Sequence, residues 1–194
     1  MAMRRQPGHP DSDPVVRLAL PVCRRYSGRV SEERAKNEAG DFLVIGYGNT
    51  LRSDDGVGAK VAAAVAELAL PGVVALVRHQ LTPELAETIS EARTVVFVDA
   101  AVDAATEVQA RRLEPAEGAQ LMAHAADPRT LLAFAKQLFG RCPPAWWLTI
   151  PVENLEFGEE LSPLARRGYE TALAKIRMLV APVPCTTNPN PRQF

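Results

Sequence analysis

The sequence of this 194-residue chain predicts an α/β fold, a sandwich built on a mostly parallel sheet. Short apolar runs typical of buried strands alternate along the chain with stretches whose apolar residues recur at helical spacing. Three times a capping residue stands directly before a proline, as it does at many helix starts: Thr82-Pro83, Asp127-Pro128 and Ser162-Pro163. Such alternation favours parallel strands joined by helical crossovers.

Five segments have the composition of strands, namely 42–47, 72–79, 94–100, 107–113 and 145–150. The first and third of these segments, FLVIGY and TVVFVDA, are apolar almost throughout, as strands buried on both faces are. The fourth, EVQARRL, alternates between polar and apolar residues, which indicates a more exposed edge strand. Helices are expected from Val57 onward, where Val61 and Val65 continue the spacing, and after each of the three capping signals.

The composition divides the chain into three parts. Residues 1–40 combine arginines and prolines without a clear period, and we expect a mostly disordered extension. Residues 41–181 are expected to form a single α/β domain. Residues 182–194 are proline-rich, which predicts an extended tail.

Charge and cysteine content exclude several classes of protein. The net charge of −1 gives no global field that would recruit nucleic acid, and no apolar run approaches the ~20 residues that span a bilayer. Cys23, Cys142 and Cys185 form no CxxC pair, so neither a zinc knuckle nor a dithiol redox site is supported. Three scattered cysteines fit a reducing compartment, so we expect a cytoplasmic protein, and a monomer is the default expectation.

Polar residues gather where the predicted strands end. Asp54 and Asp55 follow the first strand, His79 follows the second, Asp99 ends the third, and His124 precedes a predicted helix. Ligands of open α/β sheets bind at the carboxyl edge of the strands, so these residues are the candidates for a functional site. Two carboxylates and an imidazole would suit a divalent first-row metal.

Each of these residues also has a plain structural explanation. Asp54 or Asp55 could simply cap the following helix, His124 could be an ordinary loop histidine, and His79 fits a structural or supporting role better. Asp99 is the hardest to explain in this way, because a carboxylate that ends an apolar strand is costly to bury unless it is paired or bound.

The glycines after the first strand do not make a nucleotide site. Gly46 and Gly48 fit the start of a dinucleotide fingerprint, but Leu51 occupies the position of its third glycine. No G-K-[ST] sequence occurs in the chain, so a phosphate-binding lysine loop is absent as well. A nucleotide-binding oxidoreductase is therefore a disfavoured alternative, and the tight turn is expected to bring a carboxylate to the sheet edge.

The stretch GYGNTLRSDDGVG closely resembles the signature G-x-G-N-x-L-x-x-D-[DE]-G-x-G of the [NiFe]-hydrogenase maturation endopeptidases. These enzymes remove a short carboxyl-terminal extension from the precursor of the hydrogenase large subunit. The resemblance continues, in order over residues 42–180, through HQLTPELAE, VVFVDAA, HAADPRTLLAFAKQLFG and TIPVENLEFGEELSP. It departs from the family in the long amino-terminal extension and at Asp127, where a serine is commoner.

The resemblance implies a fold and a site. The fold is a three-layer sandwich, a twisted, mostly parallel five-stranded sheet with helices on both faces. Asp55, Asp99 and His124 match the acidic residues and the histidine that can hold a divalent metal, with Asp55 and Asp99 as the catalytic pair. Asp54 matches an acid that supports the loop, and Asn49 an asparagine that fixes the turn.

The resemblance also implies an activity and a partner. The expected substrate is a [NiFe]-hydrogenase large-subunit precursor, cleaved after nickel insertion, with the nickel carried by that substrate. Two chemistries stay open: a metal that activates water, or two aspartates that share a proton. The alternative from another class is a non-catalytic chaperone that checks nickel loading on the same precursor.

Overall fold

The computed structural model describes residues 41–102, 106–117 and 127–180, all within the unit Lys36–Phe194. The expectations for residues 1–40 and 182–194 lie outside the described residues and stay predictions. Among the helices of the described ranges, none is long and apolar enough to cross a membrane.

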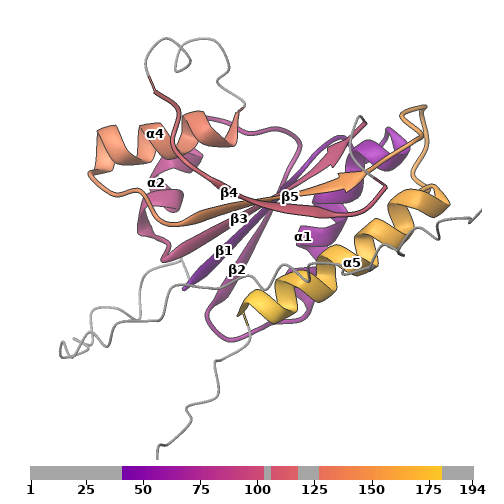
Figure 1. The fold of residues 1–194 in the computed structure, drawn as a ribbon, viewed down its shortest axis with the longest axis horizontal. Coiled ribbons are helices and arrows are strands. Elements are labelled where there is room, and N and C mark those ends of the chain that lie inside the picture. The colour runs from indigo at the N-terminus through magenta and orange to yellow at the C-terminus, as the bar shows by residue number, and fades with distance from the viewer. Residues whose placement is uncertain (1–40, 103–105, 118–126, 181–194) are drawn as a thin grey trace, which may run out of the picture. The chain divides into compact units, whose positions relative to one another are not determined.

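The centre of the fold is a five-stranded sheet in the order β2-β1-β3-β5-β4 (Figure 1). The four strands from β2 to β5 in this order pair in parallel, and β4 pairs with β5 antiparallel at the edge. The α/β fold with a mostly parallel sheet, and the edge position of the fourth strand, are therefore confirmed. The strands are β1 (Phe42–Tyr47), β2 (Val73–Arg78), β3 (Thr94–Ala101), β4 (Gln109–Leu113) and β5 (Ala145–Pro151).

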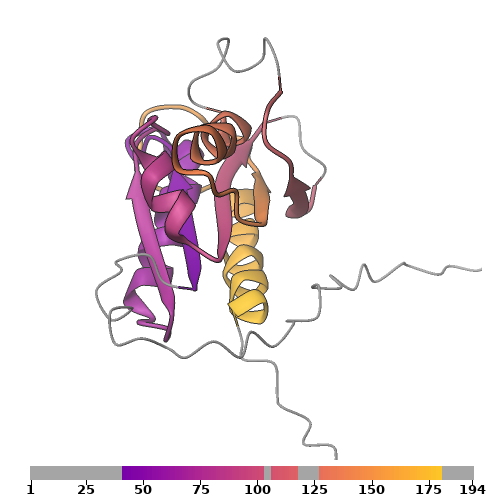
Figure 2. The same cartoon turned by 90° about the vertical axis from the view of Figure 1, so that its left-hand side faces the viewer.

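Helices cover both faces of this sheet. Helices α1 (Val57–Glu67) and α5 (Pro163–Val180) lie together on one face, and α2 (Leu85–Glu91) and α4 (Pro128–Phe139) lie together on the other, as Figure 2 shows. A short 3₁₀ helix, η2 (Ser53–Gly56), leads from the first turn into α1. The three layers expected from the resemblance are therefore present.

Two of the three predicted capping signals act as caps. The Asp127 carboxylate accepts from the backbone N–H of Arg129 at 2.8 Å, with Pro128 in the first turn of α4. The Ser162 hydroxyl accepts from the backbone N–H of Ala165 at 3.1 Å at the start of α5.

The third expectation, that Thr82 caps a helix beginning at Pro83, is wrong. Helix α2 begins at Leu85, and its cap position is Glu84, with no side-chain cap bond. The carbonyl of Thr82 accepts from Leu85 N at 3.1 Å, and that of Pro83 accepts from Ala86 N at 3.0 Å. Bonds that span three residues close a tighter turn than an α-helix, so the helix starts only after it.

On the sheet face that α2 and α4 cover, residues paired across β1, β3 and β5 form apolar rows, and a polar row follows at the carboxyl end of the strands. Leu43 pairs with Val95 and then Ala145, and Ile45 pairs with Phe97 and then Trp147. These rows pack into the core under α2 and α4. Because side chains alternate between faces, Tyr47 and Asp99 come next on this same face, at the carboxyl end of the strands. The fold therefore ends its core on an aromatic hydroxyl and a carboxylate.

The start of α1 presses closely against the sheet at Gly58. A Cβ atom at Gly58 would lie 2.3 Å from the carbonyl oxygen of Val98 and 2.6 Å from that of Tyr47. Gly46 makes the reciprocal contact, since a Cβ there would meet the carbonyl oxygen of Gly58. Only the absence of side chains lets the 3₁₀ turn and its carboxylates reach the carboxyl edge.

We expect Gly58→Ala to destabilise the protein by about 2 kcal/mol, because the collision is with backbone oxygens that cannot move aside. Helix propensity alone would make the alanine variant more stable by about 1 kcal/mol. The sign of the change in the free energy of unfolding therefore shows whether the collision or the propensity dominates. The matched control is Gly168→Ala in α5, whose Cβ would lie 2.5 Å from a methyl of Ile150, a side chain that can shift. Urea unfolding of both variants measures the difference, and an equal loss at the two sites would contradict the close-approach argument.

Candidate functional site

Asp99 stands at the carboxyl end of β3 in contact with Tyr47 of the neighbouring strand. The Tyr47 hydroxyl donates to Asp99 Oδ2 at 2.7 Å. Burial raises the pKa of Asp99 to about 6, and the negative charge of Asp55 adds to the rise, while the bonds from Tyr47 and the backbone of Ala100 oppose it. The carboxyl group is thus poised to gain or lose a proton near neutral pH.

The pKa of the Tyr47 hydroxyl is raised as well. Burial raises its pKa strongly, and the neighbouring charge of Asp99 raises it further. The hydroxyl is therefore a hydrogen-bond donor at any physiological pH.

Asp55 reaches the same edge from η2, directly after β1. Its Oδ2 accepts from the backbone N–H of Asn49 at 2.9 Å, which closes the turn between strand and helix. Gly48 in this turn has φ +135°, a conformation that favours glycine, and a Cβ there would meet the carbonyl oxygen of Asp55. The effect of Asp55 on the pKa of Asp99 places the two carboxylates within electrostatic reach of each other.

Asn49 fixes the turn as expected from the resemblance. Its Oδ1 accepts from the backbone N–H of Leu51 at 3.0 Å, the bond of an Asx turn. Two backbone donors of the loop after β1, those of Asn49 and Leu51, are therefore bound to side-chain oxygens of the loop itself. The backbone donors of residues 52–55 are bound to backbone carbonyls. The loop presents a carboxylate to the edge and no row of free amides for a phosphate.

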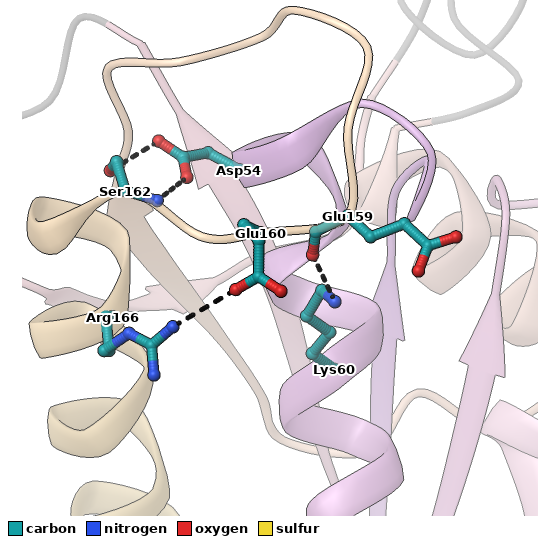
Figure 3. Close-up of polar contacts among 6 residues, drawn as sticks. All are labelled: Asp54, Lys60, Glu159, Glu160, Ser162 and Arg166. Atoms are coloured by element: carbon teal, nitrogen blue, oxygen red, sulfur yellow. Dashed lines mark hydrogen bonds and ion pairs between the residues drawn. The ribbon is translucent and has the colours of Figure 1, made fainter.

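Asp54 has a structural role, which confirms the expectation that it supports the loop. Its side chain is 0% exposed and accepts four hydrogen bonds of 2.7–3.1 Å from the segment 153–162. The donors are the backbone N–H groups of Glu153, Asn154 and Ser162 and the Ser162 hydroxyl; Figure 3 shows the Ser162 pair. Burial pushes the pKa of Asp54 up, but these donors outweigh it and hold the pKa below its usual value.

Further bonds tie the two loops together. Ser53 donates from its backbone to Gly158 at 2.8 Å and from its hydroxyl to the carbonyl of Glu156 at 3.0 Å. Lys60 of α1 donates to the carbonyl of Glu159 at 2.9 Å, while the Glu160 side chain pairs with Arg166 of α5 (Figure 3). The loop after β5 is therefore fastened to the loop that carries Asp55.

The predicted histidines do not complete a site among the described residues. His124 lies outside the described residues, so its place as a third ligand stays a prediction. His79 follows β2 and is exposed. Within residues 41–102, 106–117 and 127–180, no three His, Cys, Asp or Glu side chains form a cluster that could hold a metal ion.

The two carboxylates fit a divalent cation on chemical grounds. Oδ2 of Asp55 accepts from Asn49 and Oδ2 of Asp99 accepts from Tyr47, and the backbone of Ala100 also donates to the Asp99 carboxylate. A cation between them would relieve the repulsion that contributes to the raised pKa of Asp99. Oxygen donors with one imidazole, such as that of His124, are a set that first-row divalent metals accept.

The sequence reasoning missed Tyr47 and Trp147. Tyr47 ends an apolar strand two positions after Ile45, so strand periodicity places it on the core face beside Asp99. Trp147 lies in the row beneath, paired with Phe97, with the Arg111 guanidinium 4.3 Å from its ring centroid. Periodicity could have found the shared face of these residues, but their partners depend on the strand order.

The comparison with known proteins supports the fold. The chain matches no family model and no curated protein sequence. Several solved structures match, with identities of 21–22% and TM-scores of 0.54–0.56 among the following three. The chain has the fold of hydrogenase maturation peptidases.

Three examples span bacteria and archaea. The hydrogenase maturating endopeptidase HybD from E. coli is 21% identical, with 71% of this chain and 90% of that chain covered and a TM-score of 0.55. The [NiFe] hydrogenase maturation protease HybD from Thermococcus kodakarensis is 22% identical, with 72% of this chain and 99% of that chain covered and a TM-score of 0.56. The hydrogenase 2 maturation peptidase from Thaumarchaeota archaeon SCGC_AB-539-E09 is 21% identical, with 72% of this chain and 97% of that chain covered and a TM-score of 0.54.

We expect Asp54→Ala to lower the free energy of unfolding by about 3 kcal/mol, because it leaves several buried donors without an acceptor. Glu160→Ala in the same loop removes only an exposed ion pair and should cost less than about 1 kcal/mol. Urea unfolding monitored by circular dichroism compares the two variants. A small loss for Asp54→Ala would show that the two loops hold together without this carboxylate.

The raised pKa of Asp99 predicts a pH-dependent gain in stability on replacing it. The folded protein holds this proton more tightly than the unfolded chain, so ionisation costs stability as the pH rises from about 4 to about 6. Asp99→Asn should therefore stabilise the metal-free protein by about 2 kcal/mol at pH 8 and by little at pH 4. Thermal unfolding at both pH values measures this, with the exposed Asp41→Asn as control; a gain equal at both pH values would contradict it.

Proposed function

We propose that this protein is a [NiFe]-hydrogenase maturation endopeptidase, which removes the carboxyl-terminal extension of a large-subunit precursor after nickel insertion. The observation that carries the proposal is the pair Asp55 and Asp99, held by separate hydrogen bonds at the carboxyl edge of a sheet with the fold of such peptidases. The signature GYGNTLRSDDGVG, which supplies Asp55, supports it.

The proposed role of the carboxylates is to read the metal of the substrate and to move a proton. Asp55, Asp99 and His124 would bind the nickel that the precursor carries, which supplies Lewis acidity and a geometric check on loading. Asp99, with a pKa of about 6 in the metal-free protein, is largely ionised at pH 7 and is therefore available as a ligand. An oxygen of Asp55 that the cation leaves free would accept a proton as water attacks the scissile carbonyl and deliver it to the leaving amine.

The surroundings of the pair suit a protein substrate. Leu51 is 59% exposed and Phe157 is 87% exposed, and they flank a backbone bridge between the two loops at this edge. The bridge is closed by the N–H of Gly158, which donates to the carbonyl of Leu51 at 3.0 Å. Large apolar side chains on firmly held loops are suited to contact another protein. In this proposal the enzyme acts in the cytoplasm as a monomer that docks transiently.

The test is a cleavage assay on the nickel-loaded precursor, read by intact mass. Wild type should shorten the precursor by the mass of its extension, and Asp55→Asn should reduce the rate by about 100-fold or more. Asp41→Asn makes the same chemical change at the opposite, amino-terminal end of β1 and should cleave like wild type.

The other outcomes separate the alternatives. Cleavage at the wild-type rate by Asp55→Asn would remove Asp55 from the active site. Binding of the loaded precursor without any cleavage, repeated with a second hydrogenase precursor, would favour the checkpoint chaperone. A nucleotide-binding oxidoreductase would instead reveal itself in a titration with nicotinamide or flavin cofactors.

A further inference from the structure

Among the described residues, Tyr47 is the one side chain that donates a hydrogen bond to Asp99. It does so from the adjacent strand, one position beyond the Gly46–Val98 pair that ends the register between β1 and β3. The 2.7 Å distance is that of a strong hydroxyl–carboxylate bond. The bond occupies Oδ2 of the carboxylate.

The Tyr47 ring is firmly held. Its strand is paired on both sides, with Tyr47 opposite Arg78 of β2, and the following residue, Gly48, donates to the carbonyl of Arg78 at 3.2 Å. The ring also packs against the hydrophobic core under α2 and α4. A tyrosine has two side-chain torsions, so a held ring leaves its hydroxyl little freedom of position.

Trp147 packs against the same hydrophobic core as Tyr47. Its indole N–H is buried and has no hydrogen-bond partner among the described residues. The Arg111 guanidinium lies 4.3 Å from the centroid of the Trp147 ring and restrains the indole.

We propose that Tyr47 is a positioning residue, which holds Asp99 Oδ2 so that Asp99 offers its other oxygen alone to a divalent cation at the site. The inference rests on the proposed function, in which Asp99 binds the nickel of the substrate. Without the hydroxyl, the carboxylate turns between one-oxygen and two-oxygen binding, and ordering it costs binding free energy. Partners that orient a ligating side chain typically change metal affinity by about 10–100-fold.

Tyr47→Phe tests this directly, because it keeps the ring and removes the hydroxyl. We expect the Kd for Ni²⁺ added alone, measured by titration calorimetry, to rise about 10-fold. Tyr169→Phe in α5 makes the same chemical change on the opposite face of the sheet and should leave the Kd unchanged. The metal-free Tm reports on packing, and a packing role alone would move the Tm without moving the Kd.

The metal titration needs no precursor, so it separates this inference from the proposed function. If wild type fails to cleave but Tyr47→Phe still weakens Ni²⁺ binding, the positioning role stands and the peptidase proposal falls. If wild type cleaves, Tyr47→Phe should lower kcat on the loaded precursor more than it raises KM. A Kd within twofold of wild type, or a wild type that binds no Ni²⁺, overturns the inference.

Discussion

The buried carboxylate of Asp54 is the interaction on which the rest of the site depends. It is fully enclosed and gathers four donors from the segment 153–162, and so joins the turn after β1 to the loop after β5. A buried charge is tolerated only where its hydrogen bonds are satisfied, so sequence changes on either loop are constrained together. The adjacent Asp55 takes its position from that constraint, because the two residues share one 3₁₀ turn.

The pKa values of Asp54 and Asp99 are shifted in opposite directions. Asp54 is surrounded by donors that favour its charge, and its pKa is lowered. Asp99, across the edge, is buried beside another negative charge with fewer donors, and its pKa is raised. Ionisation of Asp99 therefore costs stability, whereas the hydrogen bonds to Asp54 stabilise the fold. Charge destabilised in this way is typical of a group that awaits a cation or a proton.

The sequence predicted the fold well, because strand and helix periodicity, proline positions and edge alternation are local signals. It also predicted that Asp55 and Asp99 share an edge, since parallel strands bring their carboxyl ends together. Residue chemistry alone could not separate Asp54 from Asp55, because the donors to Asp54 come from about one hundred residues away, and only the family resemblance assigned the two residues different roles. The sequence reasoning misjudged Thr82, where a turn precedes the helix, a difference of geometry that residue type does not encode. The third expected ligand, His124, stays a prediction.

Tyr47 illustrates what local signals leave out. In the sequence it is the aromatic end of an apolar run, indistinguishable from one more core residue of β1. The role of Tyr47 depends on the strand order. Because β3 lies beside β1, the last core residue of β1, Tyr47, lies next to the first polar residue of β3, Asp99. The core and the site are therefore continuous, from Phe97 and Trp147 through Tyr47 to Asp99. A carboxylate supported by core residues on one side can be oriented by packing, which a residue on an isolated loop cannot.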